Sequence, residues 1–111
     1  VLAQLWHCGH HAAWNTTRQP ILAPSDVPCL YYRETPKIME HEDIHTVVEA
    51  FRQSARNVRD GGLDGVEING AHSYLLAQFM SPATNRRDDE YGGRLENRLR
   101  FALEVIEATR E

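Results

Sequence analysis

The sequence is poor in cysteine, in long apolar runs and in positive charge. Two cysteines, Cys8 and Cys29, are too few for a disulfide scaffold in 111 residues, and we expect both to stay reduced in an intracellular setting. No stretch of about 18 apolar residues could span a bilayer, and no signal-peptide pattern is visible. Asp and Glu outnumber Lys and Arg by 16 to 12, which leaves no basic surface for nucleic acid. We therefore expect a cytoplasmic protein that binds neither nucleic acid nor membrane.

The composition is that of a globular protein, with 41% hydrophobic and 25% charged residues. The length suits one domain at most. The chain begins at Val1 inside an apolar run and stops at Glu111 inside a helical pattern. We therefore expect a fragment that is incomplete at both ends.

The chain contains two successive units of strand, long loop and helix. Apolar runs predict buried strands at 1–6 and 63–68, and apolar residues at helical spacing predict helices at 41–60 and from 95 onward. The polar loops after the two strands cover residues 9–37 and 69–94. Strands that alternate with amphipathic helices predict parallel βαβ units of an α/β fold, either doubly wound or closed as a barrel. In both architectures the loops after the carboxyl ends of the strands carry the chemistry.

A dense group of metal-ligand residue types, His7, Cys8, His10 and His11, follows the first strand within the stretch HCGHHA. Zinc binds such nitrogen and sulfur atoms, but a zinc site needs three or four ligands that converge, and no C-x-x-C pair accompanies the group. We favour loop histidines that are satisfied by hydrogen bonds, and we predict no metal site.

Three polar side chains follow the second strand at positions i, i+3 and i+5. They are the amide of Asn69, the imidazole of His72 and the phenol of Tyr74. An amide and an imidazole N–H can hold a carbonyl oxygen that gains negative charge, and a phenol can deliver a proton. The alternative is a polar loop in which Tyr74 only packs. No dinucleotide or phosphate-loop glycine pattern is present.

A charged run from Arg86 to Arg98 follows in the second loop. These charges could pin the loop through ion pairs or bind an anionic substrate. We favour the structural role.

Two segments resemble a known family. They are Gln4-Leu5-Trp6-His7 after the first strand, and DGVEINGAHSYLLAQFMSPATNRRDDEYGGRLENRLRF from Asp64 to Phe101. Both are similar to the old yellow enzyme family of FMN-dependent oxidoreductases, and the similarity covers essentially the whole chain. The resemblance implies a (β/α)8 TIM barrel, of which residues 1–111 form a partial FMN-binding domain of about two βα units, from the third strand to the fourth helix. We do not expect two of eight units to fold stably or to bind flavin alone.

The resemblance also implies roles for individual residues. Gln4 corresponds to the glutamine that hydrogen-bonds the flavin pyrimidine, where an amide can both donate and accept. Asn69 and His72 correspond to the pair that binds the substrate carbonyl, and Tyr74 to the tyrosine that donates a proton. Asn69 departs from the family's usual histidine or tyrosine, and AHSY with the upstream HHAA looks most like the amine dehydrogenase branch.

The function that the resemblance implies is NAD(P)H-driven reduction of activated C=C bonds in small enone or enoyl substrates by bound FMN. An alternative enzyme would oxidise small methylated amines, and a relative of another class would be a flavin-free barrel that serves as a binding module. The resemblance to the longer members of the family also allows a [4Fe–4S] cluster in a part of the enzyme that follows the barrel. Cys8 and Cys29 lack the spacing for such a cluster. The full-length form could be a homo-oligomer.

Overall fold

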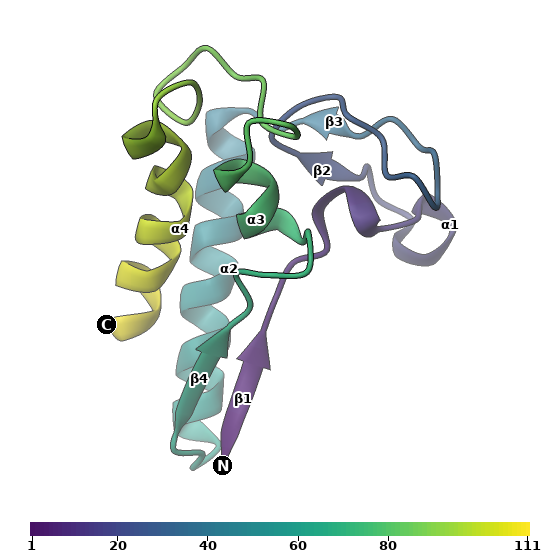
Figure 1. The fold of residues 1–111 in the computed structure, drawn as a ribbon. Coiled ribbons are helices and arrows are strands. Elements are labelled where there is room, and N and C mark those ends of the chain that lie inside the picture. Colours follow the sequence, from purple (N-terminus) through teal and green to yellow (C-terminus); the bar gives the residue numbers. More distant parts are fainter.

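The computed structural model describes residues 1–111 as a two-stranded parallel sheet, a layer of helices beside it, and a loop region beyond the ends of the strands (Figure 1). In chain order the elements are β1 (Leu2–Leu5), a 3₁₀ turn (Gly9–His11), α1 (Trp14–Thr17), β2 (Leu22–Ala23), β3 (Lys37–Ile38), α2 (His41–Asp60), β4 (Gly65–Ile68), α3 (Leu75–Met80) and α4 (Leu95–Arg110). None of the helices combines the length and the apolar character that crossing a membrane would require.

Strands β1 and β4 pair in parallel, with Leu2 opposite Gly65 and Leu5 opposite Ile68. Helix α2 connects them and lies alongside α4 (Figure 1). The predicted order of strand, helix, strand and helix is therefore present, and the two strands do run parallel. A second short parallel pair, β2 with β3, lies within the first long loop.

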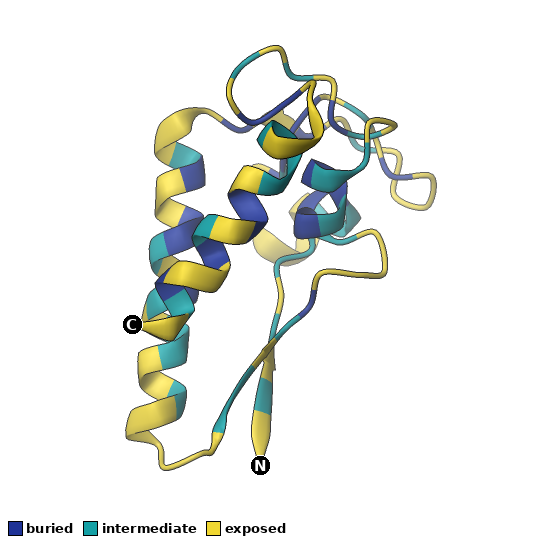
Figure 2. Cartoon of the chain, turned by 60° about the vertical axis from the view of Figure 1, so that its left-hand side comes forward, coloured by how far each residue is buried: buried dark blue, intermediate teal, exposed yellow.

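The hydrophobic core lies between α2, α3 and α4. Phe79 of α3 and Phe101 of α4 stack with their ring centroids 4.4 Å apart, and both side chains are fully buried. Helix α2 contributes the apolar stripe that its sequence predicts, including Ile44 and Phe51, on the face turned toward the other helices (Figure 2). Burial of this stripe holds α2 in place.

Two expectations about the elements are wrong. The segments expected to be loops contain short elements: α1, β2 and β3 lie within residues 9–37, and α3 lies within residues 69–94. The strands expected to be buried are partly open, since Leu2 is 61% exposed and Trp6 54%. A parallel strand is buried when helices cover both faces of its sheet and other strands flank it. Here β1 and β4 pair only with each other, and α2 packs against them.

Within the charged run of the second loop, Arg87 has the structural role that we favoured for these charges. The side chain of Arg87 is 7% exposed and forms an ion pair with Asp89, with 2.6 Å between Nη2 and Oδ2. Its Nη1 also donates to the carbonyl oxygens of Pro24 and Met39, at 3.0 and 2.6 Å. The Pro24 carbonyl belongs to the first long loop, and the Met39 carbonyl lies between β3 and α2, so Arg87 joins the second loop to the segment that connects β1 with α2.

We therefore expect Arg87→Ala to lower the free energy of unfolding of the full-length protein by about 2–4 kcal/mol, because it leaves two buried carbonyls without this donor and Asp89 without its ion-pair partner. Chemical denaturation measures the change. The matched control is Arg86→Ala, which removes an exposed side chain that has no hydrogen bond and should change stability by less than about 0.5 kcal/mol. Equal losses in the two variants would contradict the pinning role.

Candidate functional site

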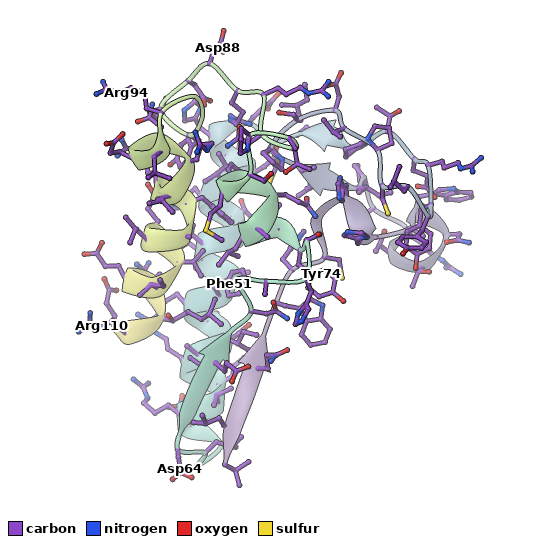
Figure 3. The ribbon with its side chains drawn as sticks, in the orientation of Figure 1. Phe51, Asp64, Tyr74, Asp88, Arg94 and Arg110 are labelled. Atoms are coloured by element: carbon purple, nitrogen blue, oxygen red, sulfur yellow. The ribbon has the colours of Figure 1, made fainter.

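The carboxyl ends of β1 and β4 bring polar side chains from the two units together. Gln4 and Glu67 are partners in the strand register, and Asn69 follows β4 directly. Gln4 and Glu67 are exposed, whereas Asn69 is buried. Tyr74 lies beyond this end of the strands, and Asp64 lies at the opposite end (Figure 3).

Asn69, Gln4 and Glu67 form a chain of hydrogen bonds that we call the Gln4 network. Nδ2 of Asn69 donates to Oε1 of Gln4 at 3.3 Å, and Nε2 of Gln4 donates to the Glu67 carboxylate. Oδ1 of Asn69 accepts the backbone N–H of Ala71 at 3.0 Å. The Asn69 side chain is therefore held by the protein itself, and no hydrogen bond links it to His72.

His72 and Tyr74 lie together at the start of the second loop, with their ring centroids 6.3 Å apart. His72 and Ser73 both adopt left-handed backbone conformations, with φ of 57° and 59°. Such conformations are strained for residues with a side chain, and they occur preferentially at functional sites. His72 is exposed, and the two residues lie just before α3 begins.

Tyr74 also contacts the first loop. Its ring and the His11 ring form a T-shaped pair, with 5.9 Å between centroids and nearly perpendicular planes. Tyr74 therefore neighbours two imidazoles, one from each βα unit. Of the predicted site residues, the structure brings His72 and Tyr74 together. Asn69 is hydrogen-bonded to Gln4 and not to His72, with which it was expected to act.

The loop histidines have the hydrogen bonds that we expected of them. Their ring atoms pair with the Gly9 amide (His7, 3.0 Å), the Val27 carbonyl (His10, 2.8 Å) and the Cys29 thiol (His11, 3.1 Å). Burial lowers the pKa of His7, and burial together with the neighbouring His10 lowers the pKa of His11. Both imidazoles are therefore mainly uncharged at neutral pH.

Gln78 of α3 is the residue of this region that sequence reasoning missed. Its side chain is 1% exposed, and its Oε1 accepts the backbone N–H of His10 at 3.1 Å. Its Nε2 donates to the carbonyl oxygens of Ser73 and Cys8, at 2.7 and 3.2 Å. Gln78 thus joins the loop after β1 to the loop after β4. The available signal was a lone polar residue in the otherwise apolar stretch LLAQFM.

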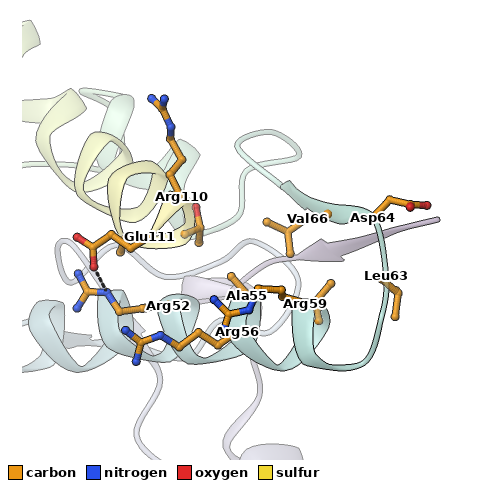
Figure 4. Close-up of a pocket in the computed structure, with 13 residues that line it drawn as sticks. Arg52, Ala55, Arg56, Arg59, Leu63, Asp64, Val66, Arg110 and Glu111 are labelled. Carbon is orange, nitrogen blue, oxygen red and sulfur yellow. Dashed lines mark ion pairs between the residues drawn. The ribbon is translucent and has the colours of Figure 1, made fainter.

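Two hollows border the sheet. One, of about 300 Å³, runs along the outer edge of β1 against α2 and is lined by Gln4, Trp6 and Phe51 among others. The other, of about 210 Å³, lies between the carboxyl ends of α2 and α4 and is lined by Arg52, Arg56 and Asp64 among others (Figure 4). The second hollow is at the end of the sheet remote from His72 and Tyr74, so it is not part of this site.

Comparison with known proteins gives a consistent match. The profile of the NADH:flavin oxidoreductase / NADH oxidase family matches residues 1–111. The chain is 42% identical over 111 residues to an N,N-dimethylglycine/sarcosine dehydrogenase of Chromohalobacter salexigens, covering 99% of this chain and 16% of that protein. It is 50% identical over 91 residues to an NADPH dehydrogenase of Geobacillus sp., covering 82% of this chain and 27% of that protein.

The solved structure of morphinone reductase superposes with a TM-score of 0.90 at 35% identity, over 97% of this chain and 33% of that one. The structural neighbours are old yellow enzyme TIM barrels, so the prediction of a partial (β/α)8 barrel is confirmed. The chain spans between 16% and 27% of the length of the two curated relatives named above.

We expect Gly9→Ala to separate the two loops. Gly9 has a φ of +58°, and a Cβ there would lie 2.1 Å from Oε1 of Gln78, whose hydrogen bonds prevent it from moving aside. Gly62→Ala is the matched control, because Gly62 has a φ of +80° and open space around it. Both variants carry the backbone strain, and Gly9→Ala should lose about 1–3 kcal/mol more in chemical denaturation. Similar losses would show that Gln78 does not hold the loops.

We also expect acid to weaken the fold before the carboxylates titrate. The pKa values of His7 and His11 in the folded protein lie below the ordinary 6.5. Below pH 6.5 these two imidazoles therefore bind more protons in the unfolded chain than in the folded one. The free energy of unfolding should therefore fall as the pH drops from 6.5 through the lowered pKa values. Denaturation midpoints at about pH 7.5 and about pH 5.5 measure this loss. His11→Gln should reduce it, and an unchanged pH dependence would count against the assignment.

Proposed function

The chain belongs to the NADH:flavin oxidoreductase / NADH oxidase family, and on that basis we propose that it is part of an FMN-dependent enzyme that uses NAD(P)H to reduce activated C=C bonds. The observation that carries the proposal is the placement of Gln4, His72 and Tyr74 at one end of a parallel strand pair. In α/β barrels this end of the strands carries the active site. The enzyme as a whole includes more chain than these residues, because the curated relatives are several times longer.

The donors and acceptors of Gln4 fit a flavin. After its bonds to Asn69 and Glu67, the Gln4 amide keeps one N–H and one oxygen lone pair. Gln4 is exposed, so both are available to a ligand at the strand ends. Adjacent N–H and C=O groups on the pyrimidine edge of FMN match that pair. When bound, FMN supplies the hydride chemistry that protein side chains lack.

The side chains near the strand ends bind the substrate and supply the proton. His72, exposed and unpaired on its strained backbone, donates a hydrogen bond to the carbonyl oxygen of the substrate and stabilises the negative charge that develops there. Tyr74 delivers a proton to the α-carbon through its phenol. His11 packs against the Tyr74 ring and helps to hold it in place. Asn69 donates to the same carbonyl oxygen through its second amide N–H, because its first N–H is bonded to Gln4.

A second candidate is the oxidation of small methylated amines. One observation favours it: among the relatives is a protein named N,N-dimethylglycine/sarcosine dehydrogenase, which is 42% identical over the whole chain. His72 and Tyr74 would then shape the pocket, and the electrons would flow from substrate to flavin. The third reading, a flavin-free binding module, is disfavoured because Gln4 keeps a free donor and acceptor beside the polar triplet.

Anaerobic mixing of the full-length protein with each substrate class separates the two enzymes. We expect NAD(P)H to bleach the flavin and cyclohexenone to restore its colour, whereas trimethylamine or dimethylglycine alone leaves the colour unchanged. Stopped-flow absorbance follows both reactions. Bleaching by the amine without NAD(P)H would contradict the ene-reductase assignment.

Tyr74→Phe tests the proton donor in the same assay. We expect the recovery of colour with cyclohexenone to slow by about 10²-fold or more, while bleaching by NAD(P)H keeps its rate. The control is Tyr91→Phe, since the Tyr91 phenol is bonded to Glu104 at 3.1 Å and its pKa is raised to about 12 by burial and by that carboxylate. A Tyr74→Phe enzyme as fast as the wild type would remove Tyr74 from the reaction.

A further inference from the structure

Glu67 has no part in the reaction described above, yet its carboxylate accepts a hydrogen bond from Gln4 at the carboxyl ends of the strands. We propose that Glu67 is a positioning residue that fixes the orientation of the Gln4 amide toward the flavin. The inference rests on the proposed function, because it assumes that Gln4 binds FMN. It goes beyond that function by assigning a role to a strand residue that touches neither flavin nor substrate.

The chemistry of the carboxylate determines which end of the amide faces it. An ionised carboxylate accepts hydrogen bonds and cannot donate one, so the Gln4 atom next to Glu67 must be the nitrogen Nε2. The oxygen and nitrogen ends of a glutamine amide have nearly the same shape, so packing alone would not choose between them. The negative charge on Glu67 therefore fixes the orientation of the Gln4 amide.

The opposite end of the Gln4 network imposes the same orientation. The backbone N–H of Ala71 donates to Oδ1 of Asn69 at 3.0 Å, which turns Nδ2 of Asn69 toward Gln4. Nδ2 donates to Oε1 of Gln4 at 3.3 Å. A reversed Gln4 amide would place two donors together at Asn69 and two acceptors together at Glu67. Both neighbours therefore exclude the reversed orientation.

The strand register explains why Glu67 can serve this purpose. Gln4 and Glu67 are directly paired across β1 and β4, so their side chains point to the same face of the sheet. The two strands therefore present the amide and its partner as one unit. If FMN binds through Gln4, the Glu67 carboxylate would be a nearby negative charge, and it would oppose the negative charge that the flavin gains on reduction.

Two Glu67 variants of the full-length protein test the proposal through flavin binding, measured by quenching of FMN fluorescence on the apoprotein. Glu67→Leu removes the acceptor, and we expect it to weaken FMN binding about tenfold. Glu67→Gln keeps an acceptor oxygen but loses the charge. It should hold oxidised FMN within about threefold of the wild type and favour reduced FMN by about tenfold, so that the midpoint potential becomes more positive.

Two controls separate positioning from folding. Glu107→Gln removes a carboxylate from an exposed position on α4 and should change neither quantity. In a Gln4→Leu background, Glu67→Leu should have no further effect on FMN binding, because its effect passes through Gln4.

Three outcomes decide the matter. The proposal is overturned if Glu67→Leu binds FMN as the wild type does, or if it weakens binding equally with and without Gln4. It is also overturned if Glu67→Gln leaves the midpoint potential unchanged, a measurement that does not depend on Glu67→Leu folding well. A wild-type protein that binds no FMN would instead overturn the proposed function.

Discussion

The parallel pairing of β1 with β4 is the constraint on which the site depends. Because the strands run in the same direction and in register, the residues that follow them emerge at one edge of the sheet. Gln4 and Glu67 become neighbours although they are 63 positions apart in the sequence. A shift of register by one residue would turn one of these side chains to the helix-covered face and separate the pair.

The long loops after the strands would not form a site without the side chains that join them. Gln78 bridges backbone groups of both loops close to Tyr74, and Arg87 bridges them again farther from the sheet. In each case one buried polar group satisfies several backbone groups that would otherwise lack partners. The ring of Tyr74 and the strained His72 are thus supported by side chains that need not touch a ligand themselves.

Much of the fold could be predicted from periodicity. Helix α2 spans the residues expected of it, because the stripe from Ile44 to Phe51 is clear and Gly61 follows its last turn. Helix α3 was missed because six residues are too few to establish a helical period. The burial of β1 was overestimated because burial depends on neighbouring strands and helices, which an apolar run does not reveal.

Some residues of the site could likewise be predicted from the sequence, and others could not. Gln4, His72 and Tyr74 stand in motifs that could be recognised along the chain, whereas the roles proposed for Gln78 and Glu67 follow from contacts between distant segments. No local pattern shows that Gln78 reaches His10, 68 positions away.

The central claim is that these two strand ends belong to an FMN-binding enzyme. The most direct measurement is the absorbance spectrum of the purified full-length protein, followed by denaturation and identification of the released cofactor by mass. The account predicts the two visible bands of an oxidised flavin and FMN in the extract. A colourless protein that takes up no added FMN would contradict it.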